Sequence, residues 1–165
     1  KQKGFDKLYD FFSKNTQFEL HVVGDFVVTE SDDYSHKKNI IFYGWVDYNQ
    51  IHNYYIESDV VIVPSRWEGF GLVAIEAMKY SKPLFVSNRG ALKDLVHDGV
   101  NGFCFDYDNF NLSLSKKISI FLKSDIKQMS KQAKIIFDKK HSIENMYKGI
   151  NRLYEKLSIE KKQYS

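Results

Sequence analysis

Short apolar runs alternate with amphipathic segments along this chain. The runs rich in β-branched or aromatic residues predict strands at 19–23, 40–43, 59–63, 83–86 and 103–105. Apolar positions three and four residues apart predict helices at 5–14, 47–57, 72–80 and 92–96, then further helices from 110 to 161 with breaks near Ser124 and His141. This alternation, with short connections, is typical of an α/β fold with a mainly parallel sheet, helices on both faces and a helical C-terminal extension.

The run at 59–63 is the strongest strand signal. Its sequence Asp-Val-Val-Ile-Val, closed by Pro64, predicts a central parallel strand that is buried on both faces. Asp47 is expected to cap the helix that precedes this strand. Ligands of such sheets bind beyond the carboxyl ends of the strands. Functional residues are therefore expected in the loops that follow Val23, Tyr43, Val63, Val86 and Phe105.

Composition places the chain among ordinary globular domains. Its 165 residues fit one domain, and 43% of them are hydrophobic and 27% charged. The net charge of +3 is too small to require a nucleic acid partner. Residues 131–165 hold nine Lys or Arg against four Asp or Glu. This basic excess fits either a solvated helical face or a peripheral contact with an anionic membrane surface, and both interpretations stay open.

The single cysteine and the short apolar runs indicate where in the cell the protein is expected. One cysteine, Cys104, allows no disulfide within the chain, which favours a reducing cytoplasm, and its apolar neighbours predict a buried small hydrophobe. No apolar run reaches the roughly 18 residues that span a bilayer, and no signal peptide opens the chain. The start at Lys1, within a loop that leads into a helix, is expected of a piece cut from a longer protein.

The most informative segment, residues 64–78, follows the run at 59–63 and opens a helix. Gly69 and Gly71 bracket one aromatic residue, and glycines let a backbone approach a ligand closely. The helix expected from Leu72 presents unpaired N–H groups and the positive end of its dipole. That arrangement binds phosphate groups.

Two carboxylates flank this helix start. Glu68 lies in the loop, whereas Glu76 lies within the helix among apolar residues. A loop glutamate is often merely solvated, but a carboxylate on an apolar helix face needs a partner because its unpaired burial is costly. Glu76 either pairs with a lysine or accepts hydrogen bonds from the two vicinal hydroxyls of a ribose.

Residues 68–78, Glu-Gly-Phe-Gly-Leu-Val-Ala-Ile-Glu-Ala-Met, resemble the signature of family 4 retaining glycosyltransferases, which have the GT-B fold of two Rossmann-like domains. Further matches follow in family order: Lys-Gly-Phe-Asp at 3–6, Val-Gly at 23–24, Phe-Tyr-Gly-Trp-Val at 42–46, Ser-Asp-Val at 58–60, Pro-Ser at 64–65 and Asp-Gly-Val-Asn-Gly at 98–102. The resemblance implies that residues 1–165 are one Rossmann-like, nucleotide-sugar-binding domain, the C-terminal half of such an enzyme, without its N-terminal acceptor domain.

The resemblance also implies roles for individual residues. Lys3 and Glu68 would be catalytic: Lys3 neutralises the departing diphosphate and Glu68 contacts hydroxyls of the donor sugar. Glu76 would bind the hydroxyls of the donor ribose. The remaining donor contacts would come from Gly69, from the backbone at Phe70, Gly71, Leu72 and Val73, from Gly24, which leaves room for the nucleotide, and from Gly44, Trp45 and Val46 near the base.

The implied activity is that of a hexosyltransferase in the biosynthesis of a bacterial surface polysaccharide or lipopolysaccharide. A sugar would pass from a UDP- or GDP-sugar to a hydroxyl of a saccharide or lipid-linked saccharide, without a metal ion, in the cytoplasm or peripherally at the cytoplasmic face of the inner membrane. The isolated fragment is expected to be inactive. Two other functions remain open: a nucleotide-binding regulatory module without turnover, and a flavodoxin-like signalling domain, although Val23-Gly24-Asp25 supplies a single aspartate where that class needs an acidic cluster.

Some positions depart from the family pattern or carry weaker signals. Ser81 stands where the family has a glycine, so a local backbone adjustment is expected there. Arg89-Gly90 replaces a Gly-Gly pair, which puts in doubt a role for the acidic residue that follows, Asp94. Asp106-Tyr107-Asp108 matches a metal-binding motif, but two aspartates after a strand are more often turn residues. The five histidines show no ligand spacing.

Overall fold

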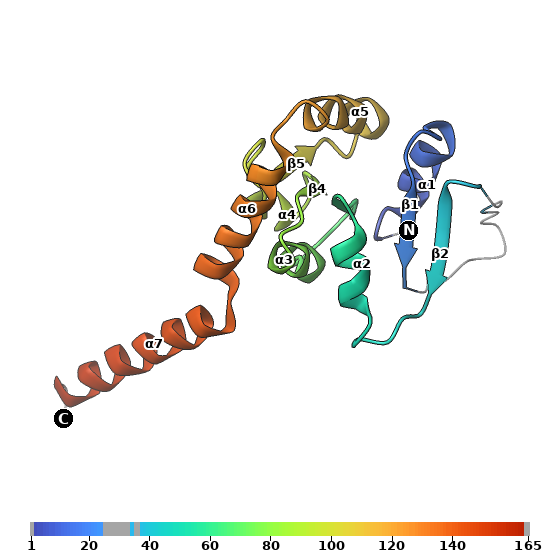
Figure 1. The fold of residues 1–165 in the computed structure, drawn as a ribbon. Coiled ribbons are helices and arrows are strands. Elements are labelled where there is room, and N and C mark those ends of the chain that lie inside the picture. Colours follow the sequence, from blue (N-terminus) through green and yellow to red (C-terminus); the bar gives the residue numbers. More distant parts are fainter. Residues whose placement is uncertain (1, 25–33, 35–36, 164–165) are drawn as a thin grey trace.

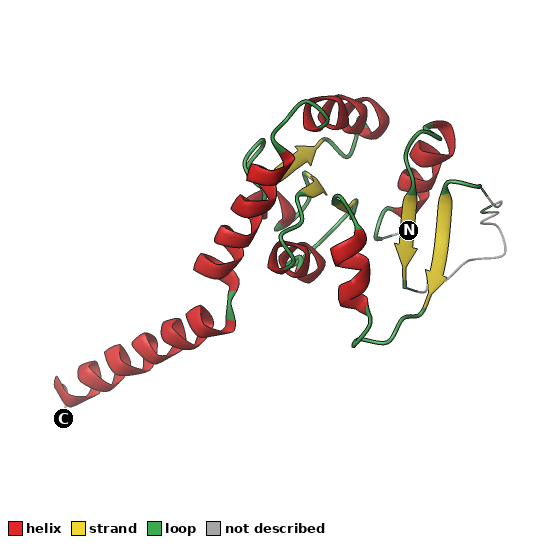
Figure 2. Cartoon of the chain, viewed as in Figure 1, coloured by secondary structure: helices red, strands yellow, loops and turns green. Residues whose placement is uncertain are grey.

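The computed structural model describes residues 2–24, 34 and 37–163, and it is an α/β fold with parallel strands, as the alternating pattern predicts. Figure 2 shows the strands flanked by helices along the chain. The strands are β1 (Leu20–Val23), β2 (Ile40–Gly44), β3 (Val61–Val63), β4 (Leu84–Ser87) and β5 (Gly102–Phe105). The helices are α1 (Phe5–Lys14), α2 (Ile51–Glu57), α3 (Leu72–Lys79), α4 (Leu92–Leu95), α5 (Phe110–Phe121), α6 (Ile126–Ile136), the π-helical turn η1 (Phe137–His141) and α7 (Ile143–Gln163).

Among the described residues, the strands form two parallel sheets rather than one. β1 pairs with β2, and β4 lies between β3 and β5. All four residues of β4 are buried, whereas Val61 and Ile62 of β3 are half-buried. The prediction that the run at 59–63 is a central strand buried on both faces is therefore wrong. The described part of the chain places β3 at the edge of its sheet, and β4 is the central strand.

Two apolar clusters hold the elements together. One joins α1, β1 and β2 to β4, β5, α5 and α6, and its large members include Phe11, Phe85, Phe103 and Phe105. The other lies under α3 and includes Ala74, Met78 and Val86. Burying a Phe or Leu side chain is worth about 1.5–3 kcal/mol, so these clusters fix how the loops at the sheet ends lie relative to one another.

The start of α2 differs from the expected cap. Oδ1 of Asp47 accepts the N–H of Asn49 at 2.8 Å, and its carbonyl accepts the N–H groups of Gln50 and Ile51. Asp47 thus closes a turn, while the helix begins at Ile51 with Gln50 at its N-cap. An aspartate forms such a local turn because its short side chain reaches the N–H two residues on.

Ser81 has φ 60, the left-handed region that usually selects glycine. Its N–H donates to the carbonyl of Met78 at 3.0 Å, and the N–H of Lys82 donates to that of Ala77 at 2.9 Å. These two bonds form the Schellman motif that ends α3. Ser81 thus occupies a conformation that favours glycine, and an adjustment relative to a glycine-bearing backbone stays a prediction.

The last helix, α7, extends away from the sheets (Figure 1). Its apolar side chains recur every three or four residues and are exposed: Ile143, Met146, Tyr147, Ile150, Leu153, Tyr154 and Leu157. No described helix is both long and apolar enough to cross a bilayer.

Candidate functional site

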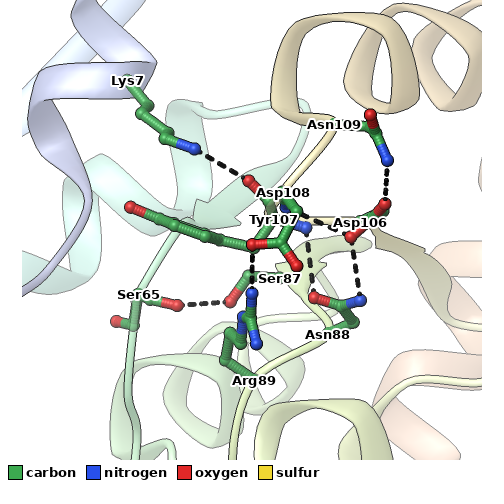
Figure 3. A network of polar contacts seen from close by, with 9 residues as sticks. All are labelled: Lys7, Ser65, Ser87, Asn88, Arg89, Asp106, Tyr107, Asp108 and Asn109. Atoms are coloured by element: carbon green, nitrogen blue, oxygen red, sulfur yellow. Dashed lines mark hydrogen bonds and ion pairs between the residues drawn. The ribbon is translucent and has the colours of Figure 1, made fainter.

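The loop of residues 64–71 lies at the carboxyl ends of the three-stranded sheet, where parallel α/β sheets bind ligands. Ser65 is buried, and its carbonyl accepts the hydroxyl of Ser87 at 2.6 Å. This bond ties the loop after β3 to the end of β4, as Figure 3 shows. The base of the loop is therefore buried and hydrogen-bonded to β4, while the side chains of Trp67 and Phe70 are exposed.

Lys3 and Glu68, 65 residues apart in sequence, meet in this loop. Nζ of Lys3 lies 2.7 Å from Oε2 of Glu68, and Oγ of Ser65 lies 3.3 Å from the same oxygen. The hydrogen bond from Lys3 is the main reason that the pKa of Glu68 is lowered, and the hydroxyl of Ser65 and the N–H of Gly71 act in the same direction against the effect of burial. An ionised carboxylate and an exposed ammonium group thus stand side by side.

Two glycines make this pairing possible by close backbone contact. A Cβ on Gly4 would lie 1.8 Å from the carbonyl oxygen of Pro64, and a Cβ on Gly90 would lie 2.1 Å from that of Glu68. Both glycines have positive φ, 71 and 56. The N–H of Ala91 also donates to the carbonyl of Glu68 at 3.0 Å. Any side chain at Gly4 or Gly90 would push this loop out of place.

The glycines expected to approach a ligand behave differently from one another. Gly71 is the N-cap of α3 with φ 83, and a Cβ there would lie 2.8 Å from Cδ1 of Leu95. Gly69 is exposed, and a Cβ there would meet the ring of Trp67 at 3.3 Å. Gly71 therefore lets α3 begin against α4, while Gly69 faces solvent.

The N-terminus of α3 is open to a ligand. The side chains of Leu72 and Val73 are exposed, and the first N–H groups of a helix have no acceptor within it. The helix dipole places partial positive charge at this N-terminus, and the carboxylate of Glu68, which pairs with Lys3, also accepts the N–H of Gly71.

Glu76, further along α3, is half-buried, and its Oε2 accepts a hydrogen bond from the Tyr55 hydroxyl at 2.9 Å. Burial, and then the charge of Glu76, raise the pKa of Tyr55, which keeps the phenol protonated as a donor. The lysine partner considered from the sequence is absent among the described residues. Sequence reasoning missed Tyr55 because nothing in the motif of α3 points to α2.

The remaining expected donor contacts lie at the carboxyl ends of β1 and β2. The N–H of Gly24 donates to the carbonyl of Gly44 at 2.8 Å, and no heavy atom of the described chain lies within 4 Å of a Cβ built on Gly24. Trp45 is 82% exposed and Val46 is half-buried. The described part of the chain thus leaves the space at Gly24 unfilled, and the role of these residues at the base stays a prediction.

A second polar network, which sequence reasoning missed, surrounds Tyr107 after β5 (Figure 3). The ring of Tyr107 has Nζ of Lys7 at 4.2 Å and the guanidinium carbons of Arg89 and Arg66 at 5.5 and 5.8 Å from its centroid. Lys7 also donates to the carbonyl of Tyr107 at 2.9 Å. These cations come from three separate segments, so no local pattern could reveal them.

The aspartates around Tyr107 act as turn residues. Asp106 accepts hydrogen bonds from the N–H of Asp108 at 3.1 Å and from the side chains of Asn88 and Asn109 at 3.2 and 2.6 Å. Asp108 forms an ion pair with Arg89. Within the described ranges, no three His, Cys, Asp or Glu side chains gather as metal ligands. Cys104, expected to be buried, is half-buried, and burial raises the pKa of its thiol.

Comparison with known proteins decides the family. Residues 1–136 match the family model of the glycosyl transferases group 1. The chain belongs to this family. An uncharacterized glycosyltransferase of Methanocaldococcus jannaschii is 30% identical over 161 residues, which cover 95% of this chain and 46% of that protein. An uncharacterized 41.2 kDa protein of the Klebsiella pneumoniae cps region is 35% identical over 113 residues, which cover 67% of this chain and 31% of that protein.

Solved structures confirm the GT-B type of fold for this group 1 chain. HepE of Anabaena, in complex with UDP, superposes with a TM-score of 0.82 at 22% identity over 94% of this chain and 46% of that one. The C-terminal domain of the group 1 protein LpcC of Francisella tularensis gives a TM-score of 0.70 at 22% identity over 86% of this chain and 81% of that one. The chain thus spans less than half the length of the two curated relatives above.

Proposed function

We propose that this chain is the C-terminal, donor-binding half of a family 4 retaining glycosyltransferase. The observation that carries the proposal is the pairing of Lys3 with Glu68 at 2.7 Å beside the open N-terminus of α3, the helix that also bears Glu76. Support comes from HepE, whose structures hold UDP and UDP-glucose. It also comes from a 34% identical relative named as a lipopolysaccharide 1,2-N-acetylglucosaminetransferase of Salmonella typhimurium, which matches 59% of this chain.

Each polar group of the site has a proposed task on a nucleotide-diphosphate sugar. Lys3 and the N–H groups of α3 stabilise the negative charge that grows on the departing diphosphate. Glu68 accepts hydrogen bonds from hydroxyls of the transferred sugar, and Glu76 accepts those of the ribose. Gly24 and residues 44–46 form the floor for the base. In this proposal the protein supplies the positive charge itself, and no metal ion is required.

The acceptor and the transfer step belong to the whole enzyme in this proposal. The acceptor hydroxyl, on a saccharide or lipid-linked saccharide of a bacterial surface glycan, is held by a domain outside these 165 residues. Transfer needs both substrates oriented and water excluded. We therefore expect the isolated chain to bind the donor without transferring its sugar.

A calorimetric titration tests donor binding. We expect one of UDP-, GDP- and ADP-sugars to bind with equal affinity in EDTA and in Mg²⁺. Glu68→Gln should weaken binding of the nucleotide sugar more than that of the bare nucleoside diphosphate, because Glu68 faces the sugar. Binding that disappears in EDTA would reject the metal-free site. Binding by a protein that also contains the acceptor domain, but without turnover, would favour a regulatory module.

We also propose a peripheral contact of α7 with anionic membranes. Its support is the exposed apolar row between Ile143 and Leu157 together with the basic excess of residues 131–165. The chain should sediment with vesicles of phosphatidylglycerol and not with neutral phosphatidylcholine vesicles, and Leu153→Glu should reduce this. Equal sedimentation with both, or none, would leave the basic residues as a solvated face.

A further inference from the structure

The contact between Tyr55 and Glu76 joins two helices across the base of the site. Tyr55 belongs to α2 and is 8% exposed, and its hydroxyl donates to Oε2 of Glu76 in α3 at 2.9 Å. Among the described residues this hydroxyl is the one hydrogen-bond donor to the Glu76 side chain. A carboxylate offers about four acceptor positions on two oxygens, so a single donor leaves Oε1 and much of the acceptor capacity unused.

The ring of Tyr55 is held as firmly as its hydroxyl. It stacks on the ring of Tyr80 with centroids 5.3 Å apart and an angle of 11° between the planes. Tyr80 is the C-cap of α3, so both ends of the Tyr55 side chain contact the helix that carries Glu76. A rigid aromatic ring with one polar tip can fix the rotamer of a flexible glutamate at little cost in entropy.

The neutral hydroxyl has a consequence that a cation would not have. A lysine at this position would bring a positive charge and compete for the Glu76 oxygens, whereas a phenol with a raised pKa donates one hydrogen bond and brings no positive charge. A charged, oriented acceptor with a free oxygen matches two adjacent hydroxyl donors.

We propose that Tyr55 is a positioning residue that sets Oε1 of Glu76 for the vicinal hydroxyls of the donor ribose. This inference rests on the proposed function of Glu76 and deepens it. Tyr55 touches no donor atom itself, and it acts by removing the rotamer freedom that Glu76 would otherwise lose on binding. The pair thereby makes the site prefer ribonucleotides over analogues that lack these hydroxyls.

The test measures the ratio of two affinities on the same preparation, with UDP and 2′,3′-dideoxy-UDP as titrants in calorimetry, or GDP and its dideoxy form if GDP is the better ligand. Tyr55→Phe removes one hydroxyl and keeps the stacked ring. We expect about a threefold to tenfold weaker affinity for UDP and less than about a twofold change for the dideoxy form. This ratio does not depend on the folded fraction of the variant, so a less stable Tyr55→Phe still decides the question.

Tyr80→Phe is the matched control, because it removes a hydroxyl from the other ring of the same stack and that hydroxyl has no hydrogen bond to Glu76. We expect it to leave both affinities unchanged. In a Glu76→Gln background, Tyr55→Phe should change the UDP affinity by less than about twofold, since neighbouring residues that act through one interaction are not additive.

The outcomes separate the inference from the proposed function. If wild type prefers UDP over its dideoxy form and Tyr55→Phe keeps that preference, Tyr55 is not a positioning residue although Glu76 binds ribose. Equal losses for both nucleotides, together with a lower melting temperature, would make Tyr55 a structural residue. If wild type binds none of UDP, GDP and ADP, or does not distinguish the dideoxy forms, the proposed function of Glu76 fails and this inference fails with it.

Discussion

The backbone contact between Gly90 and Glu68 gives a prediction with a built-in control. In Gly90→Ala the new Cβ would lie 2.1 Å from the carbonyl oxygen of Glu68, whereas ordinary contact begins at 3.4 Å. The two segments must therefore separate by about 1 Å, which weakens the hydrogen bond from the N–H of Ala91 to Glu68. Glu68 moves with its backbone, away from the position where it meets Lys3.

The cost can be divided into three parts. Alanine at φ 56 costs about 1–2 kcal/mol for the left-handed conformation. Forcing the two segments apart adds about 1–3 kcal/mol, and the weakened hydrogen bond adds about 1 kcal/mol. We expect Gly90→Ala to lower the free energy of unfolding by about 3–6 kcal/mol. Where the protein remains folded, we expect weaker nucleotide-sugar binding, because a shift of about 1 Å displaces Glu68 from the polar site.

Gly99→Ala is the control. Gly99 has φ 76, and a Cβ there would have no heavy atom of the described chain within 4 Å, so this variant measures the conformational cost alone. We expect it to lose about 1–2 kcal/mol and to bind the nucleotide sugar as wild type does. Urea unfolding followed by circular dichroism measures the free energy of unfolding of both variants. If Gly90→Ala loses no more stability than Gly99→Ala, the close approach to Glu68 does not constrain the loop.

Three further predictions concern single positions. Ser81→Gly should raise the free energy of unfolding by about 0.5–1 kcal/mol in urea titrations, because glycine relieves the left-handed strain and loses part of that gain to unfolded-chain entropy; an unchanged midpoint would count against strain. Lys3→Met should raise the pKa of Glu68 in an NMR titration. The stabilisation from that pair, about 0–1 kcal/mol because Lys3 is 68% exposed, is present above the usual glutamate pKa and lost as pH falls through the lowered one. The thiol of Cys104, whose pKa burial raises, should react with iodoacetamide at pH 8.5 about tenfold more slowly in the folded chain than in urea; equal rates would show an accessible thiolate.

Local signals predicted most of the secondary structure. The helix expected at 5–14 is α1 at the same residues, and the breaks near Ser124 and His141 separate α5, α6 and α7. These elements follow from periodicity and capping, which act over a few residues and are written in the local sequence. Two predictions were wrong: Asp47 closes a turn instead of capping α2, and β3 lies at the edge of its described sheet instead of at its centre. A capping side chain can close a preceding turn instead, and the place of a strand in its sheet depends on partners far along the chain.

The candidate site divides in the same way. The segment 64–78 predicted a loop, a helix start and two carboxylates near it, and the order of the motifs indicated the family. The residues that hold those carboxylates came from elsewhere: Lys3 to Glu68 across 65 residues, and Tyr55 to Glu76 across 21. Such pairs form because tertiary packing brings distant segments together. The periodicity of a single sequence does not reveal which distant segments meet.

The sequence by itself determined the α/β alternation, the helix start with its glycines and the position of both glutamates on that segment. The tertiary structure alone decided that Gly90 lies against the backbone of Glu68 and that a neutral tyrosine, rather than a lysine, contacts Glu76. The physical reason is range: propensity and periodicity act between near neighbours in the chain, whereas close approach, burial and charge pairing act between neighbours in space.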